Sequence, residues 1–311
     1  MIAEARAPRS ERRYEVKESE GSTRTGLSDA DVATVLQLLK GADTVELKVS
    51  IPASAHRATI QGLPMDPVEA QPRQVFFFDT PDLALNRSGV VVRARRRQGG
   101  VGDTVVKLRP VVPADLPAEV RRSPSFNVEV DALPGGFVCS GSYKGRCTGQ
   151  EVIDAARGAA PLRKLLSKQQ RAFYKAHAPA DLGLDSLVPM GPTFLLKSRF
   201  QVKKLQRLMV GELWLYPDGS RILELSTKCL PAEAFQVAAM TRAYLADRGI
   251  SIGGEQQTKT KAALEFYSAE LRAASAGPEA GEGPGPEAGE GPGPEAGEGP
   301  GPEPEAEPPQ D

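Results

Sequence analysis

Two strand-like segments with alternating charged and apolar residues most constrain how this chain can fold. Residues 89–97 and 103–109 flank a glycine-rich turn at 99–102. Successive side chains of a strand point to opposite faces, so each segment has one charged and one apolar face. The aligned cations are Arg93, Arg95, Lys107 and Arg109. Because the apolar face is already suited to a core, the cationic face is either a solvated surface or a binding surface.

Four further segments repeat this alternation and favour the binding surface. They are residues 43–51, 125–131, 193–203 and 221–228. Their charged faces mix cations with carboxylates, and the aligned charged residues include Glu46, Lys48, Glu129, Asp131, Lys197, Arg199, Glu224 and Lys228. With segments 73–79 and 207–216 the sequence predicts eight strands.

Charged faces that converge need an anion between them. Like charges repel by roughly 4 kcal/mol per pair at 4 Å in an effective dielectric near 20. Lysine and arginine suit phosphate oxygens, and carboxylates in the same enclosure suit Mg²⁺ or Mn²⁺. The sequence therefore predicts an α+β fold, an eight-stranded antiparallel closed β-barrel with flanking helices, whose charged interior holds several phosphates and a divalent metal.

The sequence resembles the CYTH superfamily, the triphosphate tunnel metalloenzymes, over roughly residues 26–272. The segments that carry the resemblance are VELK at 45–48, FFDTPDLALNRSGVVVRAR at 77–95, VVKLR at 105–109, LLKSRF at 195–200, LYPDGSRILELSTK at 215–228 and TKTKAALEFY at 258–267. The resemblance implies a tunnel fold and an enzyme that hydrolyses inorganic or thiamine triphosphate, or cyclises ATP, with Mg²⁺ or Mn²⁺.

The leading functional prediction is metal-dependent hydrolysis of a linear triphosphate. Glu46 and Lys48 are the candidate catalytic residues. The candidate phosphate-binding residues are Lys48, Arg93, Arg95, Lys107, Arg109, Lys197, Arg199 and Lys228. The candidate metal ligands are Glu46, Glu129, Asp131 and Glu224. Lys259 and Lys261 match a lysine-bearing segment of the family, and a solvated helix start explains them equally well.

Two positions depart from the family pattern. Thr44 stands where the family opens its Glu-x-Glu-x-Lys strand, and Ser226 replaces the second carboxylate of a late Glu-x-Glu. The departures are compatible with one metal instead of two, with weak catalysis, or with binding without turnover. An adenylyl cyclase and a non-catalytic triphosphate- or polyphosphate-binding module therefore stand as alternatives.

The chain is expected to hold one tunnel domain, residues 27–274, between disordered ends. Residues 1–26 are rich in charged residues and serine, and the segment 275–311 contains three copies of GPEAGEGP. That density of glycine and proline opposes folding. Residues 277–311 hold ten acidic residues and no basic one, so the remainder carries a formal charge of +9 despite the net charge of −1. A basic domain fits a triphosphate or polyphosphate ligand.

Other features of the sequence bear on whether the protein binds nucleic acid, crosses a membrane or is secreted. No basic patch is interleaved with aromatic residues, so nucleic acid is not expected. The sequence has no apolar signal-peptide core and no run of 18 apolar residues, which predicts a cytoplasmic protein without a membrane span. The oligomeric state has no signature. The Gly/Ser/Lys-rich residues 133–149 predict a loop or lid, with a phosphate-binding nest as the alternative.

Overall fold

Nine strands of the described residues form one closed barrel in this computed structural model, which describes residues 29–134, 136–250, 252 and 259–276. The strands are β1 Thr44–Ile51, β2 Gln71–Asp79, β3 Val90–Arg97, β4 Val101–Leu108, β5 Phe126–Leu133, β6 Gly136–Thr148, β7 Val188–Val202, β8 Arg207–Leu215 and β9 Arg221–Cys229. The chain divides into two units, residues 1–275 and 276–311. The predicted disordered segment 1–26 and the acidic repeats lie outside the described residues.

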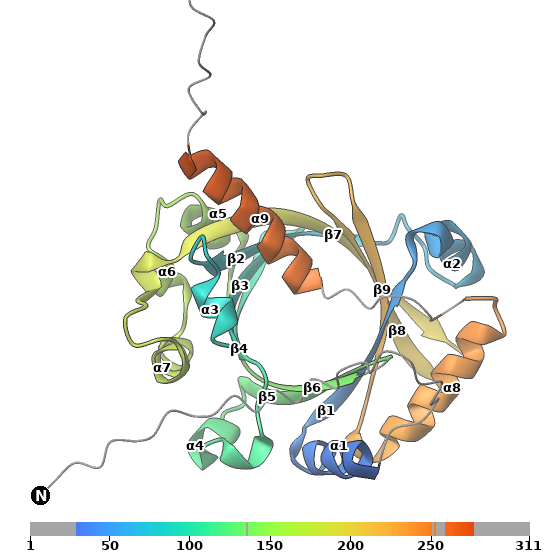
Figure 1. The fold of residues 1–311 in the computed structure, drawn as a ribbon. Helices are drawn as coiled ribbons and strands as arrows, with labels where there is room; N and C mark the ends of the chain where they lie inside the picture. The colour runs from blue at the N-terminus through green and yellow to red at the C-terminus, as the bar shows by residue number, and fades with distance from the viewer. Residues whose placement is uncertain (1–28, 135, 251, 253–258, 277–311) are drawn as a thin grey trace, which may run out of the picture. The chain divides into compact units, whose positions relative to one another are not determined.

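The ring closes in the order β1-β5-β6-β4-β3-β2-β7-β8-β9 (Figure 1). Every described neighbour pair is antiparallel except β1 and β5, which run parallel. In that pair Glu46 lies opposite Asp131, and Thr44 lies opposite Glu129. Residues directly opposite each other share a face of the sheet. This closure brings the charged faces of two strands that are far apart in sequence onto one side.

The predicted α+β barrel with flanking helices is confirmed, whereas the strand number and the all-antiparallel pairing differ. The additional strand is β6, in the glycine-rich run predicted as a loop. Its glycines give room to side chains on the outer face. A Cβ at Gly141 would lie 2.7 Å from the ring of Phe126, and one at Gly145 would lie 2.6 Å from Gln170. Glycine here serves close packing within a strand rather than a turn.

Helices cover much of the outer face, as Figure 1 shows. The described helices are α1 Asp29–Gly41, α2 His56–Gly62, α3 Ala84–Arg87, α4 Ala118–Arg121, α5 Gly149–Ala156, α6 Leu162–Leu165, α7 Lys168–His177, α8 Ala234–Ala246 and α9 Lys259–Ala276, and of these α9 packs against the inner face instead. One apolar cluster lies between the β3–β4–β5–β6 side and its helices, around Val92, Val106 and Phe173. A second lies on the β8–β9 side, around Leu225 and Leu245. The apolar strand residues of these two clusters point outward, so the polar residues that alternate with them point to the inner face.

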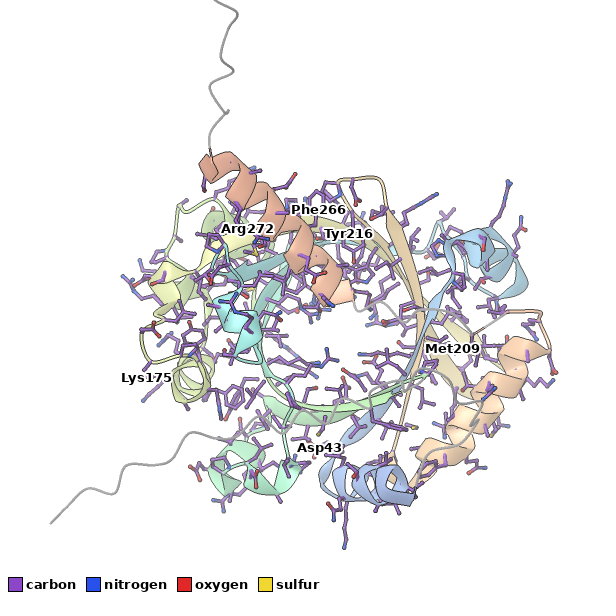
Figure 2. The ribbon with its side chains drawn as sticks, viewed as in Figure 1. Asp43, Lys175, Met209, Tyr216, Phe266 and Arg272 are labelled. Carbon is purple, nitrogen blue, oxygen red and sulfur yellow. The ribbon has the colours of Figure 1, made fainter. Side chains whose placement is uncertain are left out.

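A third apolar cluster lies on the inner face and packs against α9. Phe77 pairs with Arg93 in register, so its ring points inward with the predicted cations. Phe77 and Trp214 pack with Ala263 and Leu264 of α9. Tyr216 and Phe266, both labelled in Figure 2, belong to the same region. No described helix, α9 included, combines the length and apolar character needed to cross a membrane.

The turn after β2 is built around a buried carboxylate. Asp79 is 2% exposed and accepts hydrogen bonds from the backbone N–H groups of Thr80, Leu85 and Asn86 at 2.7–2.9 Å. These bonds satisfy donors at the start of α3 that the short helix leaves unpaired. Leu83, before that helix, adopts a left-handed backbone with φ of 62°. The conspicuous DTPDLAL segment therefore has a structural role in holding β2 to β3.

Candidate functional site

Charged side chains from strands around the whole ring project toward its centre (Figure 2). The strand pairings place the predicted residues on this inner face. Lys228 lies opposite Glu46, and Lys197 lies opposite Glu212. Arg93 lies opposite Phe77, and Arg199 shares a face of β7 with Lys197. Every predicted site residue therefore faces the interior, where the charges separate into two clusters and a group of arginines.

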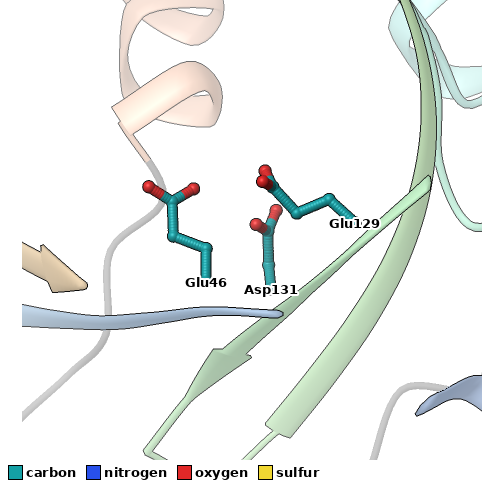
Figure 3. A group of neighbouring side chains, drawn as sticks. All are labelled: Glu46, Glu129 and Asp131. Atoms are coloured by element: carbon teal, nitrogen blue, oxygen red, sulfur yellow. The ribbon is translucent and has the colours of Figure 1, made fainter. Parts of the chain in front are cut away.

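The first cluster contains three carboxylates that point toward one another (Figure 3). Glu46 comes from β1, and Glu129 and Asp131 come from β5. One carboxylate oxygen of each lies within 4.8 Å of the others. Asp131 is fully buried, with 0% of its side chain exposed. Parallel pairing of β1 with β5 creates this group, since both strands present alternate residues to the interior at the same level.

Cations surround Asp131 on three sides. Lys48 Nζ and Arg109 Nη2 each lie 2.8 Å from its carboxylate oxygens, and Lys107 Nζ lies at 3.6 Å. Burial alone raises the pKa of Asp131, but Lys107, Lys48 and Arg109 outweigh it and hold that pKa well below its usual range. Asp131 is therefore ionised throughout the physiological range.

Glu46 and Glu129 share the remaining cations of this cluster. Lys48 Nζ lies 3.0 Å from Glu46, while Lys228 pairs with Glu129 and lies 3.8 Å from Glu46. Burial raises the pKa of Glu46, but the attraction of Lys48 and Lys228 lowers it to about 2. Lys228 differs from Lys48 in exposure, since 52% of its side chain is accessible against 16% for Lys48. Its ammonium group can therefore leave the carboxylates without moving the barrel wall.

Two hydroxyl groups, of Thr44 and Ser226, lie at the positions where the sequence resemblance implied carboxylates. Thr44 Oγ1 donates to Glu129 at 3.2 Å, and Ser226 Oγ donates to Glu46 at 3.3 Å. Each hydroxyl lies beside a carboxylate of the first cluster. The substitutions remove negative charge and leave a hydrogen-bond donor that orients the neighbouring carboxylate.

The second cluster joins Glu212 and Glu224 through lysines. Lys259 Nζ donates to both carboxylates at 2.6 Å, and Lys197 Nζ donates to Glu212 at 2.6 Å. Glu224, predicted as a metal ligand, lies in this cluster and not among the three carboxylates of the first. Glu212 was absent from the predicted site residues. Its position opposite Lys197 on the charged side of β8 is the signal that identifies it.

Several inner-face cations are only partly compensated by protein carboxylates. Burial and the repulsion of Arg95 lower the pKa of Arg93 to about 10. Burial, together with repulsion from Lys48 and Arg109, lowers the pKa of Lys107 to about 8, although Asp131 opposes the shift. Among the described residues, the buried Nε–H groups of Arg93 and Arg109 have no hydrogen-bond partner. Buried donors without acceptors are costly, which indicates that an anion belongs here.

The cationic character extends to the β3–β4 end of the barrel. Arg95 pairs with Asp103 at 2.8 Å. Beyond it, a pocket of about 310 Å³ is lined by three arginines, Arg73, Arg96 and Arg97, among other residues. The buried Nε–H of Arg97 also lacks a hydrogen-bond partner in the described part of the chain. Arginine side chains therefore line a pocket at this end of the barrel as well as its interior.

The strands form a closed β-barrel with a charged inner face, and solved structures with a similar fold are known. The fold is similar to that of HpAC1 from Hippeastrum, described as a candidate adenylyl cyclase with a dominant triphosphatase activity, at a TM-score of 0.55 and 15% identity over 71% of this chain and 95% of that chain. A candidate adenylate cyclase from Bacillus halodurans gives a TM-score of 0.47 at 15% identity over 70% of this chain and 98% of that chain. HpAC1 and this protein therefore share the closed-barrel fold that the sequence resemblance implied.

Sequence comparisons add nothing to this assignment. No family model matches the chain, and no curated protein matches it. At 15% identity the structural likeness concerns the fold alone. Function must therefore be argued from the site.

Proposed function

We propose that this protein hydrolyses a linear triphosphate, inorganic or organic, with a divalent metal bound on the inner face of its barrel. The observation that carries the proposal is the combination of three convergent carboxylates with buried arginine Nε–H groups that lack hydrogen-bond partners among the described residues of the same interior. Phosphoanhydride hydrolysis requires neutralisation of phosphate charge, a metal across phosphate oxygens and a positioned water. The chain supplies groups for each requirement.

The carboxylate group fits a hard divalent cation. Glu46, Glu129 and Asp131 offer oxygen atoms within 4.8 Å of one another. Binding of a metal there requires the three carboxylates to move closer together and the half-exposed Lys228 ammonium group to depart. Glu46, Glu129 and Asp131 would hold Mg²⁺ or Mn²⁺, which would neutralise part of the phosphate charge.

The cations would bind the phosphate chain beside that group. Burial and, to a smaller extent, the repulsion of neighbouring cations lower the pKa of Arg93 and of Lys107, and a polyanion would offset that repulsion. An arginine side chain suits two phosphate oxygens at once, whereas lysine acts as a point charge. The full proposed phosphate-binding set is Lys48, Arg93, Arg95, Lys107, Arg109, Lys197, Arg199 and Lys228.

In the proposed reaction, water attacks the terminal phosphorus. The bond from that phosphorus to the bridging oxygen breaks, the oxygen departs with the diphosphate product, and the proton lost by the water passes to the product phosphates or to solvent. Glu46 is a weak base, because its pKa is about 2, so its role is to orient rather than to deprotonate. Attraction from Asp131 and Glu46 outweighs the effect of burial and raises the pKa of Lys48, which keeps the ammonium group charged beside the phosphates.

Phosphate release with tripolyphosphate, ATP and thiamine triphosphate, with and without Mg²⁺ or Mn²⁺, tests the proposal. Metal-dependent phosphate release from at least one of these supports it. Cyclic AMP from ATP would identify a cyclase instead. Tight binding without any product would identify a binding module, the alternative that Thr44 and Ser226 favour by removing negative charge beside the carboxylates.

Ligand-induced stabilisation separates a specific polyanion site from a basic surface. A ligand at 100 times its dissociation constant adds about 2.7 kcal/mol to stability. Tripolyphosphate should raise the thermal midpoint more than orthophosphate at equal ionic strength. Arg95→Ala should abolish that difference, whereas Arg163→Ala should preserve it. The two arginines are matched, because each pairs with an aspartate, Arg163 with the exposed Asp185.

A further inference from the structure

Two carboxylates of the second cluster are held directly opposite each other. Glu212 of β8 and Glu224 of β9 are register partners in an antiparallel pair. Side chains in such positions have Cβ atoms about 4.5–5.5 Å apart, and like charges there destabilise the sheet. Only 13% of the Glu212 side chain and 6% of the Glu224 side chain are exposed. This arrangement requires a cation, since water cannot screen the pair effectively.

Lys259, at the start of α9, supplies that cation. Its Nζ atom donates to Glu212 Oε2 and Glu224 Oε1 at 2.6 Å each. The ammonium group also lies 5.2 Å from the ring centre of Trp214, within range of a cation–π interaction. Burial lowers the pKa of Lys259, but the two carboxylates outweigh this effect and raise it, so the group is charged at neutral pH.

The helix that carries Lys259 is fixed to the barrel at several points. Lys259 is the first residue of α9, and its carbonyl accepts a hydrogen bond from Tyr216 Oη at 3.1 Å. Further along α9, Tyr267 Oη donates to Pro192 O at 2.7 Å, and Ser268 Oγ donates to the carbonyl of residue 81 at 2.6 Å. Ala263 and Leu264 are buried against the inner face. The ammonium group is therefore placed by the fold and not by a flexible tether.

The two clusters differ in what holds their carboxylates together. In the first, the three carboxylates as a group contact both the largely buried Lys48 and Lys228, and Lys228 has half of its side chain exposed. In the second, two carboxylates share Lys259, of which 14% is exposed. The first can therefore exchange Lys228 for a metal, whereas the lysine that joins the two carboxylates of the second is largely buried.

We propose that the Lys259 ammonium group occupies, as a built-in cation, the position where Glu212 and Glu224 would otherwise bind a second divalent metal, so that the barrel binds one metal ion. The inference rests on the proposed function for the metal at the first cluster. It reassigns Glu224 from metal ligand to partner of Lys259. It also assigns α9 a part in the electrostatics of the site, because its first residue supplies positive charge that a second ion would bring.

Mn²⁺-binding stoichiometry tests the inference without any need for turnover. Titration of the full chain, followed by the electron paramagnetic resonance signal of free Mn²⁺ and by calorimetry, should give one ion for the wild type. Lys259→Met removes the charge at similar length and should give two. Lys261→Met is the matched control, since Lys261 is 70% exposed two residues away, and it should give one ion. Two ions in the wild type, or one in a folded Lys259→Met, would overturn the inference.

A second pair of variants serves if Lys259→Met fails to fold. Glu224→Gln should change the Mn²⁺ dissociation constant by less than about twofold, whereas Glu46→Gln should weaken binding at least about tenfold. Equal weakening by both would place Glu224 among the ligands and overturn the inference. The result is separable from the proposed function. A wild type that binds one ion but releases no phosphate refutes triphosphate hydrolysis and leaves the assignment of Lys259 intact, whereas a wild type that binds no ion contradicts both.

Discussion

Replacing Asp131 by asparagine should destabilise the protein more than any other single loss of charge in the interior. The side chain is fully buried, and three cations lie within 3.6 Å of its oxygens. Each such pair attracts by roughly 4 kcal/mol or more at an effective dielectric near 20, and the cost of burying the charges offsets most of the sum. Asparagine removes the attraction and leaves the cations buried.

The net loss should be about 3–5 kcal/mol, the range found when one partner of a buried ion pair is removed. Urea unfolding at pH 7 without divalent metal measures it, with the free energy extrapolated to water. The thermal midpoint should fall by roughly 6–20 °C, since 1 kcal/mol corresponds to about 2–4 °C for a domain of this size. Tripolyphosphate should restore more stability to the variant than it adds to the wild type, because the uncompensated cations then bind the anion.

Glu129→Gln is the matched control for this prediction. Its partner Lys228 is 52% exposed and can turn to water, so the loss should stay below about 1 kcal/mol. A loss for Asp131→Asn as small as that of the control would show that the cations around Asp131 are not held as the structure indicates.

Three other measurements follow from the same contacts. Asp79→Ala should lower the free energy of unfolding by about 1–3 kcal/mol in a urea titration, because three backbone N–H groups lose their acceptor, while alanine at the exposed Asp82 should have little effect. Burial raises the pKa of Glu212, but Lys259 and Lys197 outweigh it and hold that pKa well below 4.5. The ionised Glu212 therefore stabilises the folded protein above pH 4.5, and this stabilisation is lost as the pH falls below that value. The free energy of unfolding, measured at several pH values, should fall less steeply in acid for Glu212→Gln than for the wild type, and an equally steep fall would contradict this. A chain truncated after Ala276 should keep its thermal midpoint and activity, and a midpoint several degrees lower would show that the acidic repeats contribute to the fold.

Residue alternation was sufficient to predict which side chains face the interior. In strands, alternate positions share a face. Glu46 and Lys48 could therefore be assigned to one face of their strand, and Glu129 and Asp131 to one face of theirs, before any pairing was known. The pairing itself could not be deduced. The contact of Lys48 with Asp131 at 2.8 Å depends on β1 lying parallel to β5, a non-local choice that no local pattern encodes.

The strand β6 shows why a local pattern can mislead. Its glycines and serines have low strand propensity, so residues 133–149 read as a loop. The glycines are required by tertiary contacts, since Gly141 lies under the Phe126 ring and Gly145 under Gln170. Propensity describes a residue alone, whereas these positions are decided by what packs against them. The same limitation applies to Lys259, whose buried partners are visible only once α9 is placed on the barrel.

The most direct test of the central claim is metal-dependent phosphate release by the wild type and Glu46→Gln across a range of Mn²⁺ concentrations. The substitution is nearly isosteric and faces the interior, so folding should survive. We expect tripolyphosphate turnover to fall at least about tenfold, which corresponds to roughly 1.4 kcal/mol of barrier. We also expect the Mn²⁺ concentration needed for half-maximal rate to rise. A variant as active as the wild type, with the same Mn²⁺ dependence, would contradict the assignment of the carboxylate cluster as the metal site.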